Sequence, residues 1–248
     1  MENKKKGMSR RDFVKRSGLL VGGLAGGTVL GGLIGPKVTD QSDENSNETT
    51  DLNSYNEALM YFTNMEDFNV IKAATERIFP ADDNRPGAID LLVPFYIDHQ
   101  LAGAYGNNSR EYMQGPFHKG EPTQGYQSRM KRNEIFDVGI KGIKDYSEKT
   151  FDDKFVNLDG EQQDEVLTAL ENDEIELRGV SSSFFFALLR SATLEGIYAD
   201  PLYGGNKDME GWKMKEYPGD QMSYLDVIES EEFIQDELTT SSLKDHHN

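Results

Sequence analysis

Four histidines are the first residues to consider for acid–base or metal chemistry. His99 lies in the apolar stretch "YIDHQ", and Asp98 beside it falls on a different side of a helix, so the two are not expected to act as a pair. A histidine held by a backbone group is therefore favoured over a catalytic or metal-ligating one. His118 lies in "GPFHKGEP", and His246 and His247 lie in the C-terminal tail. No histidine pair, and no histidine with an E-x-x-H partner, has the spacing of a metal site.

Neighbouring carboxylates are the second candidate. "FPADDNRPG" contains Asp82 and Asp83, and paired carboxylates serve acid–base catalysis or bind calcium. The alternating oxygen ligands and the closing glutamate of a calcium-binding EF-hand loop are absent, so we expect Asp82 to cap a turn shaped by Pro86 and Gly87. Among 44 Asp and Glu residues, a glycosidase-like pair arises by chance. A carboxylate-dependent hydrolase stays open as an alternative.

Cofactor chemistry has little support in the sequence. The chain has no cysteine, which excludes disulfides, thiolate metal sites, iron–sulfur clusters and covalently attached haem. No G-x-G-x-x-G follows a strand, and neither a phosphate-binding Walker loop nor a G-x-S-x-G motif occurs. The net charge of −18 argues against nucleic acid as a partner. The sequence thus predicts no catalytic, cofactor-binding or metal-binding residue in this chain.

Two stretches rich in glycine and aromatic residues remain, "AGAYGNNSREYMQGPF" over residues 102–117 and "EGIYADPLYGGNKDMEGWKMKEYPG" over residues 195–219. Aromatic rings on glycine-shaped loops stack on sugars or anchor a protein interface, whereas the alternative is a loop that packs on itself. Both interpretations stay open. The residues expected to contact a partner or to shape the loop are Tyr198, Asp200, Pro201, Tyr203, Gly204, Gly205, Asn206 and Trp212. A second group with the same expectation is Tyr96, His99, Tyr105, Tyr112 and Phe117.

The elements that position these residues have the apolar spacing of helices. The expected helices cover residues 64–80, 86–106, 123–150, 158–172, 181–198 and 220–228. Pro94 is expected to begin a new turn or to kink the second helix, and Asp159 with Gln162 gives the fourth a capping signal. No alternating strand occurs. The sequence therefore predicts a small all-α domain over residues 55–230, with long Gly/aromatic loops, and a flexible tail over residues 231–248.

Residues 1–35 have the features of an export signal or N-terminal anchor. "SRRDFVK" carries the paired arginines Arg10 and Arg11, followed by Phe13 and Lys15, and resembles the twin-arginine signal. A Gly-rich apolar run follows. Since that run is barely long enough to span a membrane and no clear cleavage site follows it, a cleaved signal and a retained anchor both stay open.

Residues 36–54 are polar and acidic and lack apolar periodicity, which predicts a disordered linker. The twin-arginine route exports folded proteins, often with a cofactor in place or a partner attached. Because this chain has little with which to hold a cofactor, we expect a partner protein to travel with it. The expected location is the outer face of the cytoplasmic membrane, in the periplasm or at the cell surface.

Together these segments resemble the gluconate 2-dehydrogenase subunit 3 family, the small or gamma subunits of exported sugar and sugar-acid dehydrogenases. The resemblance rests on the leader and on "IFPADDNRPGAI", "VPFYIDHQLAGAYG", "YMQGPF" and "EGIYADPLYGGNKDMEGWKMKEYPG", which follow in order over most of residues 55–222. It implies that catalysis belongs to a separate large flavoprotein of the GMC type, which carries FAD. In such complexes a haem c subunit often receives the electrons.

The resemblance implies a non-catalytic small subunit of an exported, membrane-associated, FAD-dependent gluconate, sugar or polyol dehydrogenase. This subunit would escort the flavoprotein through the twin-arginine translocon and stabilise it. The substrate stays open, because gluconate, fructose, glucose and sorbitol all fit. A free-standing exported carbohydrate-binding or interaction protein is the alternative, since the same aromatic residues could bind sugars.

Overall fold

The computed structural model describes residues 57–118, 120–121, 124 and 127–220, together with residues 223, 225, 228–229, 231, 240–243 and 245. The predicted export signal with Arg10, Arg11, Phe13 and Lys15 lies outside the described residues, as do the linker and the histidines His246 and His247. The predicted limits of the leader, linker, domain and tail stay predictions.

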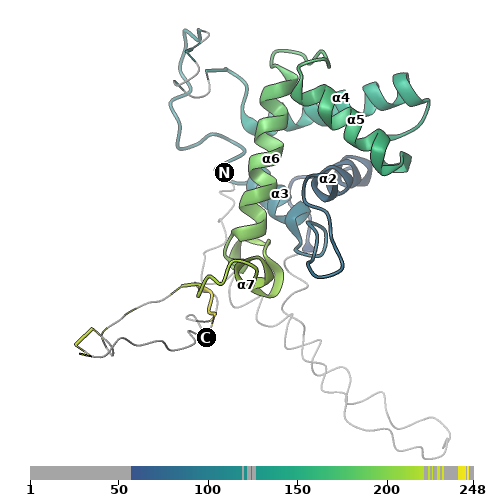
Figure 1. The fold of residues 1–248 in the computed structure, drawn as a ribbon. Coiled ribbons are helices and arrows are strands. Elements are labelled where there is room, and N and C mark those ends of the chain that lie inside the picture. The colour runs from purple at the N-terminus through teal and green to yellow at the C-terminus, as the bar shows by residue number, and fades with distance from the viewer. Residues whose placement is uncertain are drawn as a thin grey trace, which may run out of the picture. The chain divides into compact units, whose positions relative to one another are not determined.

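The described chain is helical, and no strand forms within it, which confirms the predicted all-α class (Figure 1). No helix among these residues has the length and apolar character needed to cross a membrane. The α-helices are α2 (Met65–Ile78), α3 (Val93–Ala102), α4 (Arg132–Phe151), α5 (Gly160–Glu171), α6 (Ser182–Tyr198) and α7 (Glu210–Lys213). Short 3₁₀ turns form η2 (Phe155–Asn157), η3 (Pro201–Tyr203) and η4 (Lys207–Met209).

Three helices begin at side-chain caps. The Asn64 side chain accepts a hydrogen bond from the Glu66 amide at the start of α2, and Ser181 caps α6 in the same way. At α5 the Asp159 side chain accepts from the Gln162 amide, and the Gln162 side chain accepts from the Asp159 amide, which confirms the predicted capping signal. These caps satisfy amides that have no partner inside the helix.

The second predicted helix is shorter than expected. Residues 88–92 form turns, and α3 begins only at Val93, with Pro94 in its first turn. Leu92 has a left-handed backbone, with φ of 59°. The prediction of a helix that runs through this position was therefore wrong. Proline suits the first turn of a helix because the amide that it lacks would have no partner there.

Two other limits also differ from the prediction. The third helix starts at Arg132 rather than near residue 123. Ser223, Leu225 and Ile228 lie in turns or coil, so the short helix predicted over residues 220–228 does not include them. The sequence analysis also missed α7 and the 3₁₀ turns, because their lengths are too short for apolar periodicity to show.

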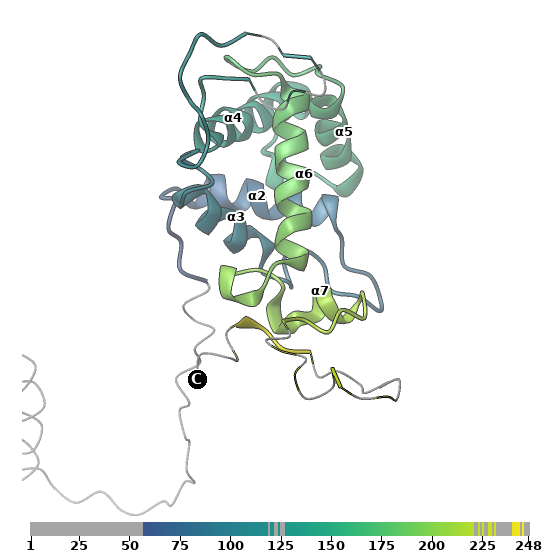
Figure 2. The same cartoon turned by 90° about the vertical axis from the view of Figure 1, so that its left-hand side faces the viewer.

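Helix α6 is the centre of the domain. It packs against α5, α3, α4 and α2, and both views show it lying across α2 and α3 (Figures 1 and 2). Phe136 of α4 meets Phe185 of α6 edge to face, with ring centroids 5.5 Å apart, and both side chains are fully buried. Burial of each such ring stabilises the fold by about 1.5–3 kcal/mol. The core therefore fixes one face of α6 and positions the loops at its ends.

Candidate functional site

Asp98 and His99 fasten the entry of the domain to α3. The buried Asp98 carboxylate accepts hydrogen bonds from the amides of Met60, Tyr61 and Phe62, at 2.5, 3.1 and 2.8 Å. His99 Nε2 donates to the Ala58 carbonyl oxygen at 2.9 Å. His99 is thus held by a backbone group, as the sequence analysis favoured.

The role of Asp98 was missed by the sequence analysis. The sequence did contain a hint of this role, since Asp98 is a carboxylate within an apolar helix. A carboxylate buried at such a position needs several hydrogen-bond partners. In this chain those partners are backbone amides, which no sequence pattern reveals. The buried carboxylate is therefore a structural anchor for the segment that enters the domain.

Asp82 closes the turn after α2. Its carboxylate accepts from the Asn84 amide at 2.9 Å and forms an ion pair with Arg85 at 2.7 Å. The Arg85 hydrogen bond lowers the pKa of Asp82, and the backbone bond from Asn84 adds to the effect. Within the described part of the chain, no group of three His, Asp or Glu side chains could hold a metal ion. The geometry around Asp82 is that of a turn cap.

The loop between α6 and α7 packs on itself around Asn206. This buried side chain donates to the Ala199 carbonyl oxygen at 2.8 Å and accepts from the Gly211 amide at 2.7 Å. Trp212 is only 7% exposed, and its indole Nε1 donates to the Tyr198 carbonyl oxygen at 2.7 Å. These bonds tie the loop to the C-terminal end of α6, where helix carbonyls lack partners within the helix.

Two glycines allow this close packing. A Cβ atom at Gly211 would lie 1.9 Å from the Ile197 carbonyl oxygen, so any side chain there would force the backbones apart. Gly204 has φ of 95°, and a Cβ there would lie 2.7 Å from Nδ1 of His99. Glycine alone fits the lack of space for a Cβ atom at position 211 and the positive φ at position 204 without strain. The loop, α3 and α6 therefore form one packed unit.

The residues predicted to contact a partner or to shape the loop divide by exposure. Those that are buried are Tyr96, Gly204, Gly205, Asn206 and Trp212. Those with partial exposure are His99, Tyr105, Phe117, Tyr198, Asp200 and Pro201. Tyr112 is 80% exposed and Tyr203 is 50% exposed. The buried residues shape the loop, and partner contact by the exposed ones stays a prediction.

Asp200 joins the loop to the end of the described chain. Its carboxylate accepts from the Leu202 amide and from the Leu243 amide, both at 2.8 Å. Ser241 also pairs with the backbone around Gly219. Within the segment predicted as a flexible tail, Leu243 thus contacts the loop, and Ser241 contacts the chain that follows α7.

A polar and aromatic cluster links α3, α4 and α6. The Arg132 guanidinium lies 4.4 Å from the Tyr105 ring centroid and pairs with the Glu111 carboxylate at 2.5 Å. Burial raises the pKa of Tyr105 to about 12, and the nearby charge of Glu195 acts in the same direction. Burial likewise raises the pKa of Tyr96.

Glu195 is the carboxylic acid of this cluster. Partial burial raises the pKa of Glu195, although its hydrogen bond with Tyr96 and the charge of Arg132 act in the opposite direction. Much of the Glu195 side chain is nevertheless open to solvent, so water limits the effect on stability. The cluster anchors the loop that follows α3 and leaves Tyr112 on its surface.

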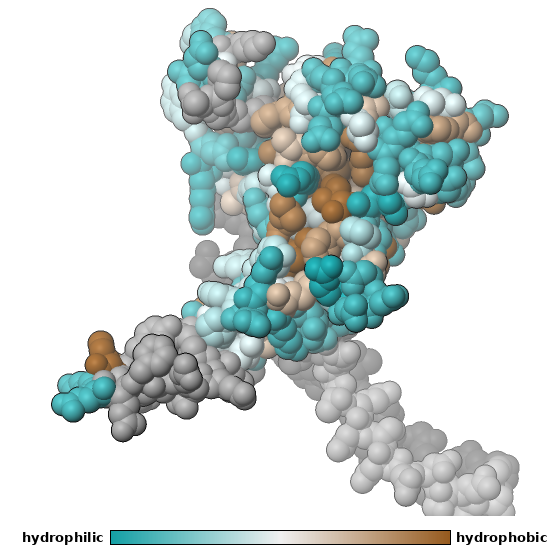
Figure 3. Space-filling model, viewed as in Figure 1, coloured by the Kyte–Doolittle hydropathy of each residue, from teal (hydrophilic) through white to brown (hydrophobic). Residues whose placement is uncertain are grey.

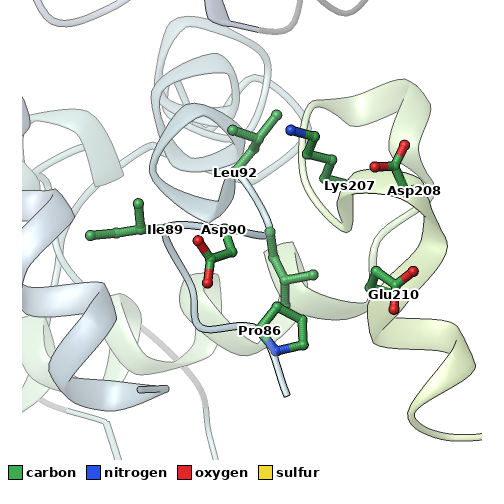
Figure 4. A pocket seen from close by; sticks show the side chains of 8 residues that line it. Pro86, Ile89, Asp90, Leu92, Lys207, Asp208 and Glu210 are labelled. Carbon is green, nitrogen blue, oxygen red and sulfur yellow. The ribbon is translucent and has the colours of Figure 1, made fainter. Parts of the chain in front are cut away.

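A cavity of about 410 Å³ opens between the turn before α3 and the loop before α7. Figure 4 shows residues 207–210 on one side of the cavity and residues 86–92 on the other. The lining combines apolar and charged side chains, namely Pro86, Ile89, Asp90, Leu91, Leu92, Lys207, Asp208 and Glu210. The Lys207 amide donates to the Leu91 carbonyl oxygen at 3.3 Å and joins the two segments.

Residues 65–219 match the family model described as gluconate 2-dehydrogenase subunit 3. The chain belongs to this family. Comparisons with curated proteins and with solved structures returned no match. By the family's description, subunit 3 proteins are parts of a multi-subunit dehydrogenase. The matched range runs from α2 to beyond α7, so it includes both segments that border the cavity.

This subunit 3 domain presents an apolar helix face at its surface. Ala187 and Ser191 of α6 are exposed, and apolar side chains one turn away on the same face are half-buried. The face consists of Ala187, Leu188, Ser191, Leu194 and Tyr198, and is called the α6 outer face below. Figure 3 shows apolar residues gathered on the side of the domain that α6 crosses. In both ribbon views no other helix is drawn in front of α6 (Figures 1 and 2).

Proposed function

We propose that this chain is the non-catalytic small subunit of an exported, membrane-associated, FAD-dependent gluconate, sugar or polyol dehydrogenase. It binds the large GMC-type flavoprotein, stabilises it and escorts it through the twin-arginine route. FAD belongs to that partner, and whether a haem c subunit joins the complex stays open. Family membership supports a place in a dehydrogenase complex, and the surface of the domain supports a binding role.

The observation that carries the proposal is the α6 outer face. Helix α6 is mostly apolar, and its only charged residues are Arg190 and Glu195. A largely apolar helix is normally buried on most of its sides, yet Ala187 and Ser191 face solvent. Apolar surface left open on a soluble domain marks an interaction site. Because the family consists of subunits, we assign this face to the flavoprotein.

The state of the aromatic residues supports binding to protein over free sugar binding. Sugar stacking needs an open ring face, but Trp212 and Tyr96 are buried, at 7% and 8% exposure. The Trp212 indole N–H also has a backbone partner. Exposed Tyr203 and Tyr112 lie on loops, where they suit a protein interface.

The carboxylates support a non-catalytic role, because several have structural partners. Arg77 donates to both Asp164 oxygens, at 2.8 and 2.6 Å, and so joins α2 to α5. Lys144 pairs with Asp67 and joins α4 to α2. Asp98 holds the domain entry. A glycosidase pair needs two carboxyl groups on either side of one substrate, whereas Asp164, Asp67 and Asp98 are bonded to other parts of the chain.

A co-purification experiment tests the proposal. The full chain is expressed with a GMC-type flavoprotein of the same organism, and binding is measured with the purified pair. Ala187→Arg with Ser191→Arg places two long charged side chains at the centre of the α6 outer face. We expect at least a tenfold loss of affinity, because charges opposite an apolar interface lose hydration without gaining partners.

The control is Thr168→Arg, an exposed position on α5. Both proteins should keep the thermal unfolding midpoint of the wild type. If the wild-type chain neither binds nor stabilises the flavoprotein, the proposed function is wrong. If the α6 variant binds like the control, a different face makes the contact.

The export step has a separate test. The predicted signal supports it through Arg10 and Arg11. Changing both to lysine should leave this chain and its flavoprotein in the cytoplasm on cell fractionation. Unaltered export of the double variant would contradict a twin-arginine route.

A further inference from the structure

The cavity between residues 86–92 and residues 207–210 has charged side chains and no aromatic ring. Its carboxylates are Asp90, Asp208 and Glu210, and its one ammonium group is that of Lys207. The apolar side chains of the turn before α3 complete the lining (Figure 4). The cavity therefore offers an apolar surface within a rim of net negative charge.

The backbone on both sides of the cavity is unusual. Leu92, Asn206, Asp208 and Met209 have φ of 59°, 48°, 55° and 59°. A left-handed backbone costs about 1–3 kcal/mol for residues other than glycine, and persists where the surrounding structure imposes it. At Asn206 the buried hydrogen bonds impose it. The packing of the loop thus fixes where the Asp208 and Glu210 side chains leave the backbone.

Three of the rim charges, Asp90, Asp208 and Lys207, have no ion pair among the described residues. Glu210 pairs with Lys213 at 2.7 Å, and Asp90 accepts from the Gly87 amide at 3.2 Å. For Asp208 and Lys207 no such bond is present. The Asp208 carboxylate is therefore available to an incoming cation.

The distribution of these carboxylates excludes two kinds of ligand. They do not converge into a group able to hold a metal ion, a finding made for the described residues. A sugar acid is itself an anion, so a rim with more carboxylates than ammonium groups repels it. The ligand class that fits is a cation whose donors reach carboxylates spread around a rim and whose flat faces lie on apolar side chains. A guanidinium group has both properties.

We propose that this cavity receives an arginine side chain of the flavoprotein subunit, with Asp208, Glu210 and Asp90 as its acceptors. The proposal rests on the proposed function and adds the chemistry of one contact. Charge complementarity selects the partner over a second copy of this chain, because the net charge of −18 opposes self-association. The arginine enters from the open side of the cavity, and its guanidinium packs on Leu92.

The test uses the full chain with its flavoprotein and measures the dissociation constant at several salt concentrations. The pocket variant combines Asp90→Asn, Asp208→Asn and Glu210→Gln, which keep side-chain size, and asparagine tolerates the left-handed backbone at position 208. We expect at least about a tenfold loss of affinity and a weaker salt dependence, because charge pairs across an interface control both.

Two control variants make the result specific. Asp145→Asn with Glu171→Gln removes exposed carboxylates from α4 and α5, away from this cavity, and should leave affinity unchanged. Lys207→Gln removes the one cation of the rim, so it should tighten binding. A purely structural role for the cavity would not give opposite effects for the two signs of charge.

A charge-reversal series identifies the occupant. Glu210→Lys should weaken the complex, and an Arg→Glu change on the flavoprotein should restore it. If restoration instead comes from reversing a basic residue among residues 1–16 of this chain, its own leader is the occupant and the proposal is wrong. If Glu210→Lys abolishes a homodimer seen by sedimentation, a second copy is the occupant and the proposal is likewise wrong.

The outcomes separate the two proposals. No binding of the wild-type chain to the flavoprotein removes the proposed function and this inference with it. Normal binding of the pocket variant, together with loss of binding by the α6 variant, keeps the proposed function and refutes the arginine contact.

Discussion

Replacing Asp98 with alanine should lower the free energy of unfolding by about 3–5 kcal/mol, because three backbone amides lose their charged acceptor at once. The Asp98 carboxylate accepts three backbone amides. Each hydrogen bond to a charged group contributes about 1.5–3 kcal/mol. The expected loss is smaller than the sum of the three hydrogen bonds, because the Met60 and Tyr61 amides are only partly buried and can bind water in the variant. The Phe62 amide is buried and keeps its full desolvation cost.

The assay is urea unfolding of the full chain followed by circular dichroism. Asp98→Asn gives an internal comparison, because its oxygen can replace Oδ1 for Tyr61 and Phe62 while its NH₂ group faces the Met60 amide. Its loss should therefore be smaller than that of the alanine variant. Asp83→Ala, at an exposed carboxylate, should change stability by less than about 0.5 kcal/mol. A loss below about 1 kcal/mol for Asp98→Ala would refute the view that this carboxylate anchors the domain entry.

Three further predictions concern the loop and the cluster beside it. Gly211→Ala should destabilise the domain by about 2–4 kcal/mol, since its Cβ would meet the Ile197 carbonyl oxygen at 1.9 Å, whereas Gly103→Ala, with no contact closer than 3.4 Å, should cost little on thermal unfolding. Trp212→Phe should cost about 1–3 kcal/mol in urea, because it leaves a carbonyl of α6 unpaired. The folded-state pKa of Glu195 is raised above the value of 4.5 that applies when unfolded. The folded state therefore binds the Glu195 proton more tightly than the unfolded state does. The resulting contribution to the free energy of unfolding decreases as pH rises above 4.5. Glu195→Gln should remove that decrease, so unfolding midpoints of variant and wild type should diverge from pH 4 towards pH 7, and parallel curves would contradict the assignment.

The helices could be predicted where local signals sufficed. Asp159 with Gln162 marks the start of α5 through a cap that is wholly local, and the apolar residues of α2 repeat at helical spacing. The start of α3 could not be found in this way, because Leu92 takes a left-handed backbone that its residue type disfavours. This turn is joined to the loop before α7, more than one hundred residues away in the sequence, through the Lys207 amide and the Leu91 carbonyl oxygen.

The candidate site was predicted only in part, for the same reason. The aromatic and glycine residues around Tyr203 could be selected by residue type. Residue type alone does not predict that Trp212 is buried and Tyr112 is exposed. Asp90 and Lys207 were not predicted as site residues, since each is an ordinary charged residue in its own segment. They line one cavity because two distant turns meet there.

The buried residues of the loop and the exposed residues around it have complementary roles. Asn206 and Trp212 use their polar atoms on the backbone of α6 and its end, so they have little left for a partner. Their effect on binding must be indirect, through the positions of Tyr203 and Asp208. A substitution at Trp212 should therefore reduce stability and affinity together, whereas Asp208→Asn should reduce affinity at constant stability. The two kinds of residue in one motif can be separated by measuring both quantities for each variant, and equal behaviour of the two would show that the loop acts only through its fold.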